Sequence, residues 1–277
     1  MATSGRGATR PDSGKAPPGH RAGGVSPRRA RRDHVTPENV DSPGSGRDNS
    51  ERQQREARIL DAAATLLVRW GFRKTTIDDV AREAGVGKGT IYLHWRDKNE
   101  LFRAAIWRAY ELLSEDILQR IKSDPEGGLP HRLWTHGMIA TLDNPLMAAI
   151  MRDQSDIFQG LMGGLDQMSR MKLSGNAEEY VTKLQRAGLV RSDLEPSHIT
   201  YVMTALKVGI INAPDILGRE RAPSLEQLTD TVSDLMRRWL EPEKLPSESE
   251  EGKQLLESLL EGVQEVGESS LAKGEQK

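Results

Sequence analysis

Apolar residues recur at helical spacing from residue 59 onward, and glycines divide the pattern into short segments. The first stripe ends at Gly71. Its members stand mostly three or four residues apart: Ile59, Ala63, Leu66, Leu67 and Trp70. This spacing predicts an amphipathic helix whose apolar side faces a core.

A second, shorter helix is predicted between Thr76 and Gly85. Thr76 and Asp79 have the spacing of a capping box, in which each side chain accepts a hydrogen bond from the other's backbone N–H. The inward positions of this helix are Ile77, Val80, Ala81 and Ala84. After a tight turn through Gly87, a third helix is predicted from Lys88 to about His94.

The chain then continues into a long amphipathic helix. Asp97 and Glu100 repeat the capping-box spacing at its start. Its apolar positions include Leu101, Ala105, Trp107, Leu112 and Leu113. Prolines and glycines divide the remainder into helical segments of about 10–20 residues. Because neither strand alternation nor an internal repeat is found, we expect an all-α fold.

Changes in composition set the expected domain boundaries. Residues 1–50 are rich in Gly, Pro, Ser and Arg, which predicts a disordered basic tail. Residues 51–97 form the unit of short helices, and 98–240 a second helical domain. Residues 241–277 are expected to be an acidic, weakly helical or disordered tail. Its weak apolar stripe consists of Leu255, Leu256, Leu259, Leu260 and Val263.

Charge is distributed unevenly along the 277 residues, although the net charge is only −2. Residues 1–50 carry nine Lys and Arg against five Asp and Glu, and 51–106 carry eleven against eight. Residues 241–277 reverse this, with four against ten. The asymmetry favours a polyanionic partner for the first part. A basic cluster in the tail is interpreted either as an arm on DNA or as a solubilising segment: Arg28, Arg29, Arg31 and Arg32.

Composition also excludes several classes of site. The chain has no cysteine, so disulfides, thiolate metal sites and cysteine nucleophiles are excluded. No apolar run reaches the roughly 18–20 residues that a membrane span needs; the most apolar stretch, 199–213, is interrupted by Lys207. The N-terminus lacks the apolar region of a secretory signal. We therefore expect a cytoplasmic protein without a membrane partner.

The third predicted helix, GKGTIYLHW, combines cationic, small and aromatic residues. Two short helices joined by a glycine turn and braced by a first helix make a helix-turn-helix unit, whose second helix enters the DNA major groove. Ile91 and Trp95 are expected to face inward, which turns the others outward. The outward side chains can bind phosphates and base edges, and a glycine among them lets the backbone approach the DNA closely. The outward residues are Lys88, Gly89, Thr90, Tyr92, His94 and, from the next helix, Lys98.

Residues 59–102, ILDAAATLLVRWGFRKTTIDDVAREAGVGKGTIYLHWRDKNELF, resemble the DNA-binding domain of the tetracycline-repressor (TetR) family. The matching positions are Gly71–Phe72, Thr75–Thr76, Ala81, Ala84–Val86 and Gly89–Tyr92. Gly87 stands where Ser or Thr is frequent, which weakens the N-cap, and Trp95 replaces a more usual Phe. The resemblance says little beyond about residue 110.

The resemblance implies an N-terminal helix-turn-helix domain and a C-terminal helical domain that binds a small ligand and forms a homodimer. It also implies binding to double-stranded DNA at an inverted-repeat operator. The implied contacts come from Thr76, Lys88, Gly89, Thr90, Tyr92, His94 and Lys98. Repression of transcription is the commoner outcome that it implies, and activation remains open.

Methionines other than Met1 all occur at or after Met138, among aromatic residues of the second domain. Thioether side chains adapt to irregular ligands, so a pocket for an apolar or aromatic effector is one interpretation. Ordinary core packing is the alternative for each residue. The candidate ligand-binding residues are Trp134, Met138, Met147, Met151, Phe158, Met162, Tyr180 and Tyr201.

Two segments near the end, 198–213 and 224–240, are long enough to pair with their copies in a four-helix dimer interface. The first has a face of small and apolar residues: Val202, Ala205, Leu206, Gly209 and Ile210. The second has a larger apolar face: Leu225, Leu228, Val232, Leu235, Met236 and Trp239. A ligand that changes the spacing of the two recognition helices would then change DNA affinity.

The sequence does not favour an enzyme, a metal site or a cofactor. His131 and His136 are five residues apart, which does not place them on one helical face for zinc. No nucleophile elbow, P-loop or dinucleotide fingerprint occurs in a strand–helix context. The alternative to a ligand-responsive regulator is a similar DNA-binding protein that responds to a protein partner or to no ligand. A second domain without a pocket would favour that alternative.

Overall fold

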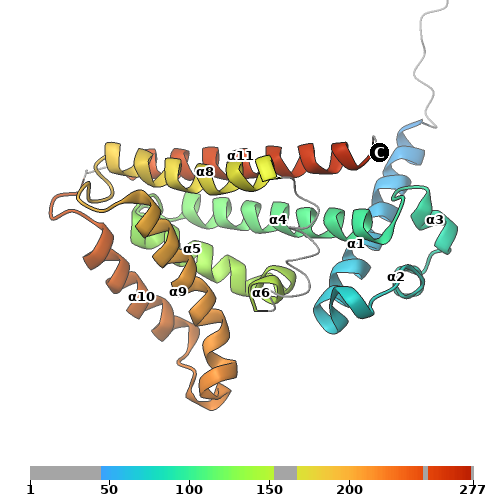
Figure 1. Cartoon of the computed structure of the whole chain (residues 1–277), viewed down its shortest axis with the longest axis horizontal. Coiled ribbons are helices and arrows are strands. Elements are labelled where there is room, and N and C mark those ends of the chain that lie inside the picture. Colours follow the sequence, from blue (N-terminus) through green and yellow to red (C-terminus); the bar gives the residue numbers. More distant parts are fainter. Residues whose placement is uncertain (1–44, 153–166, 246–248, 276–277) are drawn as a thin grey trace, which may run out of the picture. The chain divides into compact units, whose positions relative to one another are not determined.

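The computed structural model describes residues 45–152, 167–245 and 249–275, and these ranges contain helices and no strand (Figure 1). The all-α expectation is therefore confirmed for the part of the chain described. The elements are α1 (Ser45–Lys74), α2 (Ile77–Ala84), α3 (Lys88–Tyr92), α4 (Lys98–Ser123), α5 (Pro130–Asp143), α6 (Pro145–Arg152), α8 (Gln167–Arg186), α9 (Pro196–Leu217), the 3-10 turn η1 (Arg219–Arg221), α10 (Leu225–Leu240) and α11 (Glu250–Glu275).

Helix α1 begins at Ser45, upstream of the expected boundary, and residues 1–44 of the predicted tail lie outside the described ranges. Its regular geometry breaks at Gly71, where φ is 77° and ψ 174°, at the predicted end of the helix. Thr75 is fully buried, and its hydroxyl donates a hydrogen bond to the Gly71 carbonyl at 2.8 Å. This bond stabilises the backbone where the helix breaks. Trp70, at the end of the predicted apolar face, is 42% exposed. Helical spacing identifies the apolar face of a helix but does not show how far other helices cover it.

Helix α1 packs on both α2 and α4, and α3 packs on α2. Ile91 of α3 is fully buried, and Trp95 after it is 6% exposed, as the pattern predicted. Leu101 and Phe102 of α4 belong to the same core. Packing is therefore continuous across the expected boundary between residues 97 and 98, and the described residues form one compact unit.

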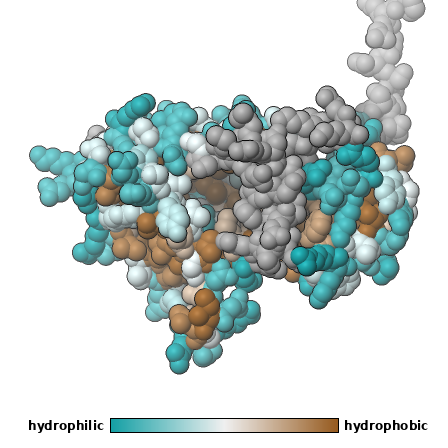
Figure 2. All heavy atoms as spheres, in the orientation of Figure 1, coloured by the Kyte–Doolittle hydropathy of each residue, from teal (hydrophilic) through white to brown (hydrophobic). Residues whose placement is uncertain are grey.

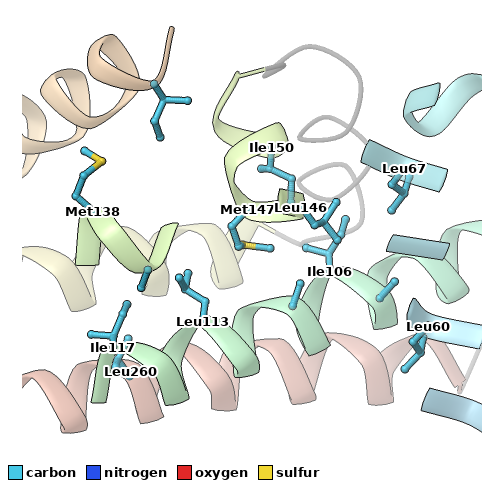
Figure 3. Packing of buried hydrophobic residues seen from close by; sticks show 14 of the residues in the cluster. Leu60, Leu67, Ile106, Leu113, Ile117, Met138, Leu146, Met147, Ile150 and Leu260 are labelled. Carbon is cyan, nitrogen blue, oxygen red and sulfur yellow. The ribbon is translucent and has the colours of Figure 1, made fainter. Parts of the chain in front are cut away.

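The remaining helices extend this core along α4. Helix α10 packs on α5, and α11 packs on both α8 and α4. Figure 3 shows buried side chains from α1 through α4 to α11, with Leu60, Ile106, Leu113 and Leu260 labelled. One continuous hydrophobic core therefore connects the N-terminal helices to the rest of the described chain.

Residues 241–277 were expected to be an acidic, weakly helical or disordered tail, but residues 250–275 form a long helix that packs on the rest of the described chain. This helix is α11, in which Leu256, Leu260 and Val266 are buried. A side chain on Gly252 would collide with the backbone of Gly128, so the two segments approach closely. The surfaces that bury these leucines belong to α4 and α8, which are distant in the sequence. The apolar pattern of residues 241–277 alone therefore did not show that the helix would be packed.

Candidate nucleic-acid interface and cavity

Local hydrogen bonds define α2, the helix that precedes the recognition helix α3. Thr76 caps α2: its hydroxyl accepts from the Asp79 N–H at 3.2 Å, and its own N–H donates to Asp79 Oδ2 at 3.0 Å. This confirms the predicted capping box. Gly85 ends α2 in the left-handed conformation with φ 66°, which glycine adopts without strain. Both ends of α2, the helix that precedes α3, are therefore well defined.

Replacing Thr76 with alanine is expected to lower the free energy of unfolding by about 0.5–2 kcal/mol, as loss of an N-cap does. The Thr76 side-chain and backbone hydrogen bonds keep the pKa of Asp79 below its usual value. This effect is present at neutral pH and is lost as the pH falls through the lowered pKa. Titration of Asp79 by NMR should show its pKa rising in the variant. An unchanged Asp79 pKa and unchanged stability would contradict the capping role.

Helix α3 presents a small polar surface. Lys88, Gly89 and Tyr92 are exposed, Thr90 is half-buried, and the helix ends at Tyr92 rather than His94. Nothing in the described structure lies within 4 Å of where a side chain on Gly89 would begin. The protein itself therefore leaves this backbone open to an external partner.

Two lysines border this surface in different ways. Lys88 Nζ lies 2.8 Å from Asp78 Oδ2, and this hydrogen bond raises the Lys88 pKa. Lys98 Nζ lies 4.6 Å from the centre of the Phe72 ring and donates to the Arg73 carbonyl at 3.4 Å. Burial lowers the Lys98 pKa. Lys88 can leave the exposed Asp78 carboxylate and bind a DNA phosphate instead. Lys98, by contrast, is packed on the end of α1.

The expectation of an exposed imidazole at His94 was wrong. Its side chain is 8% exposed, and Nδ1 lies 3.7 Å from Glu56 Oε2 on α1. The ring also packs on Trp95, with 5.2 Å between centroids. His94 lies beyond the end of α3 at Tyr92, and its burial depends on contact with α1, which is distant in the sequence.

Three residues beside α3 were missed by the sequence interpretation. Leu93 is 80% exposed next to Tyr92. Arg52 and Arg55 of α1 line a surface hollow together with Leu93 and His94. Their basic character was visible in the sequence, but their place beside the recognition helix depends on how α1 packs.

A cavity of about 380 Å³ lies among α4, α5, α6, α8, α9, α11 and the end of α10. Four candidate residues line it: Trp134, Met147, Met151 and Tyr180. Other lining residues are Tyr110, Leu113, Ile117, Thr141, Leu184, Met203, Lys207, Leu256, Leu259 and Leu260. The volume is within the range of small-molecule sites, about 300–1,000 Å³.

The other four candidate ligand residues are not brought to this cavity. Met138 is fully buried but is not part of the wall (Figure 3). Tyr201 is 77% exposed on α9, so its assignment to a pocket was wrong. Phe158 and Met162 lie outside the described residues. Helical spacing does not distinguish a cavity wall from a core or an outer face.

Polar groups in the cavity wall are few. Lys207 of α9 is the only charged residue among the described residues that line it, and its Nζ lies 3.5 Å from Thr141 Oγ1. The Tyr180 hydroxyl is buried without a hydrogen-bond partner in the described structure. Burial lowers the pKa of Lys207, raises that of Tyr180, and raises that of Tyr110 to about 12.

Helices α9 and α10 carry exposed apolar side chains, and Figure 2 shows apolar surface on α9 down to its end. The exposed residues include Tyr201, Val202, Ile216, Leu217, Leu225 and Leu235. Within the described ranges, no helix is long and apolar enough to cross a membrane. Nor do the described His, Asp and Glu residues form a cluster of three or more that could hold a metal ion.

Comparison with known proteins gives matches at both the sequence and the fold level. The family described as bacterial regulatory proteins, tetR family, matches residues 59–105. The HTH-type transcriptional regulator SrpR of Pseudomonas putida is 28% identical over 152 residues, covering 52% of this chain and 66% of SrpR. The uncharacterized regulator TtgW, also from Pseudomonas putida, is 31% identical over 120 residues, covering 43% of this chain and 81% of TtgW.

A similar fold occurs in the SmeT–triclosan complex, with a TM-score of 0.52 and 16% sequence identity. That match covers 70% of this chain and 96% of SmeT, so the likeness in fold extends beyond the helix-turn-helix unit. The resemblance first noted over residues 59–102 is thereby confirmed. With its helix-turn-helix unit, its all-helical fold and these relatives, the chain belongs to the TetR family of DNA-binding transcriptional regulators.

Proposed function

We propose that this regulator is a dimeric repressor that binds an inverted-repeat operator and releases it when a small apolar or aromatic molecule enters the cavity. The observation that carries the proposal is the position of α4. Leu101 and Phe102 at its start belong to the core beneath α3, whereas Leu113 and Ile117 line the cavity. A ligand that favours a shifted α4 would change the orientation of the recognition helix.

The dimer is supported by the exposed apolar residues of α9 and α10. An inverted repeat requires two copies of α3 about 34–36 Å apart, in successive major grooves. Exposed side chains such as Tyr201, Val202 and Leu235 are suited to burial between two copies of the chain. Of the predicted apolar face of α10, Leu225 and Leu235 are exposed, whereas Val232 and Met236 are buried within the chain and are not available to a second copy.

The small-molecule effector is supported by the cavity itself. A protein that responds only to a protein partner needs no apolar cavity, and a wall of methionine, leucine and aromatic side chains is typical of a ligand site. SmeT, which has a similar fold, is known in complex with triclosan. Control by a small molecule is therefore favoured over control by a protein partner.

Selection of duplexes from a random pool is the experiment that tests the DNA-binding part. We expect the full chain to enrich an inverted repeat, and Tyr92→Ala to weaken binding to it by about ten-fold or more, since one lost contact costs about 1–3 kcal/mol. Tyr92→Phe separates the hydroxyl from the ring. Leu112→Ala, an exposed change on α4, is the control and should bind normally.

A variant without residues 1–44 shows in the same assay what the basic segment contributes. Enrichment of single half-sites would argue against the dimer. If no sequence is enriched at moderate salt, α3 does not read bases, and the proposal of a sequence-specific repressor fails.

A further inference from the structure

We propose that the cavity binds an amphipathic carboxylic acid, with Lys207 as the counter-ion of its carboxylate. This inference rests on the proposed ligand-binding function and names the chemical class of the ligand. It follows from three features of the described residues: a lysine without a carboxylate partner, a buried hydroxyl without a hydrogen-bond partner, and a mostly apolar cavity wall.

Lys207 is a cation without a carboxylate partner in the described structure. Its ammonium lies 3.5 Å from the Thr141 hydroxyl, which is neutral and already donates to the Gly137 carbonyl at 2.6 Å. No Asp or Glu occurs among the described residues of the cavity wall. A partly buried charge is costly unless it is paired, and the lowered pKa of Lys207 reflects that cost. A bound carboxylate would supply the missing negative charge.

Tyr180 provides a second donor from the neighbouring helix α8. Its hydroxyl is buried, and no group of the described structure accepts its proton. The threonines of α9 that line the cavity differ, because Thr200 donates to the Pro196 carbonyl and Thr204 to the Thr200 carbonyl. Lys207 and Tyr180 are therefore two donors of the wall that a ligand can use, and a carboxylate oxygen accepts from both types of group.

The rest of the wall determines the body of the ligand. Trp134, Met147, Met151 and the leucines of α11 offer apolar contacts, and methionine side chains adapt to a flexible chain. A single cation balances one negative charge, which favours a monoanion over a phosphate ester. A cavity of about 380 Å³ has room for an acid with about ten carbon atoms.

Binding of decanoate and of decan-1-ol, measured by calorimetry at pH 7 on the full chain, tests the inference. The two probes share a chain length and differ in charge. We expect decanoate to bind about ten-fold more tightly, and Lys207→Met to remove that preference while leaving decan-1-ol binding unchanged. Tyr180→Phe, which keeps the shape of the ring, should weaken decanoate binding by a smaller factor. Lys183→Met, at a lysine of α8 paired with Glu179, is the control and should keep the preference.

The outcomes separate this inference from the proposed function. Equal binding of both probes, unchanged in Lys207→Met, would overturn the carboxylate while leaving a ligand site. Binding of neither probe would overturn the inference, although operator selection could still support the DNA-binding part. Decanoate that binds through Lys207 without releasing the selected operator would support the inference and contradict the proposed switch. If Lys207→Met fails to fold, Tyr180→Phe alone decides whether the wall holds the carboxylate.

Discussion

Glu241→Ala is expected to lower the free energy of unfolding by about 2–6 kcal/mol, because two buried donors lose their acceptor and each costs about 1–3 kcal/mol. The side chains of Glu241 and His131 are both only 2% exposed, and Oε1 lies 2.6 Å from His131 Nδ1. The same oxygen accepts from the His131 backbone N–H at 3.1 Å. Removing the carboxylate leaves two buried donors at the start of α5 without an acceptor.

Arg237 completes this contact between α5 and α10. Its NH2 group lies 3.0 Å from His131 Nε2, and an arginine can only donate. Nε2 is therefore the acceptor, and Nδ1 carries the proton that it donates to Glu241. The three side chains fasten the end of α10 to the start of α5, so their loss should loosen the proposed dimer helices as well.

Urea unfolding followed by circular dichroism, at one fixed protein concentration, measures this effect. The matched control is Glu243→Ala, an exposed glutamate two residues away, which should change stability by no more than about 0.5 kcal/mol. Glu241→Gln keeps one acceptor oxygen and should lose less than Glu241→Ala. Equal stability of the Glu241→Ala and Glu243→Ala variants would show that the contact contributes nothing.

Leu260→Ala is expected to destabilise the protein by about 2–4 kcal/mol, as removal of a buried leucine does. Leu260 is 9% exposed on α11 and belongs to the core that includes Ile117 of α4, beside it in Figure 3. Glu261→Ala removes the next side chain, which is exposed, and should be nearly neutral. Urea unfolding distinguishes the two. If both variants matched the wild type, α11 would not be packed in solution.

Local signals in the sequence were sufficient for much of the N-terminal unit. The Thr76–Asp79 box and the stop at Gly85 depend on residues that are close in the chain, and both occur as predicted. The box at Asp97 is only half present: Asp97 accepts from the Glu100 N–H, but the Glu100 carboxylate accepts from the Arg96 N–H instead of its cap. Where a residue's role depends on a distant surface, as for His94 against α1, the prediction failed.

The sequence by itself determined the helical class, the helix-turn-helix unit and the family, because caps, glycine stops and apolar spacing act over a few residues. The tertiary structure decided what the second half contains. Lys207 interrupts an apolar stretch in the sequence, and only the packing of α9 among its neighbours places it in a cavity wall. The leucines of α11 likewise become core residues only against α4 and α8. Such contacts join segments far apart in the chain, and burial depends on what covers a face rather than on its spacing.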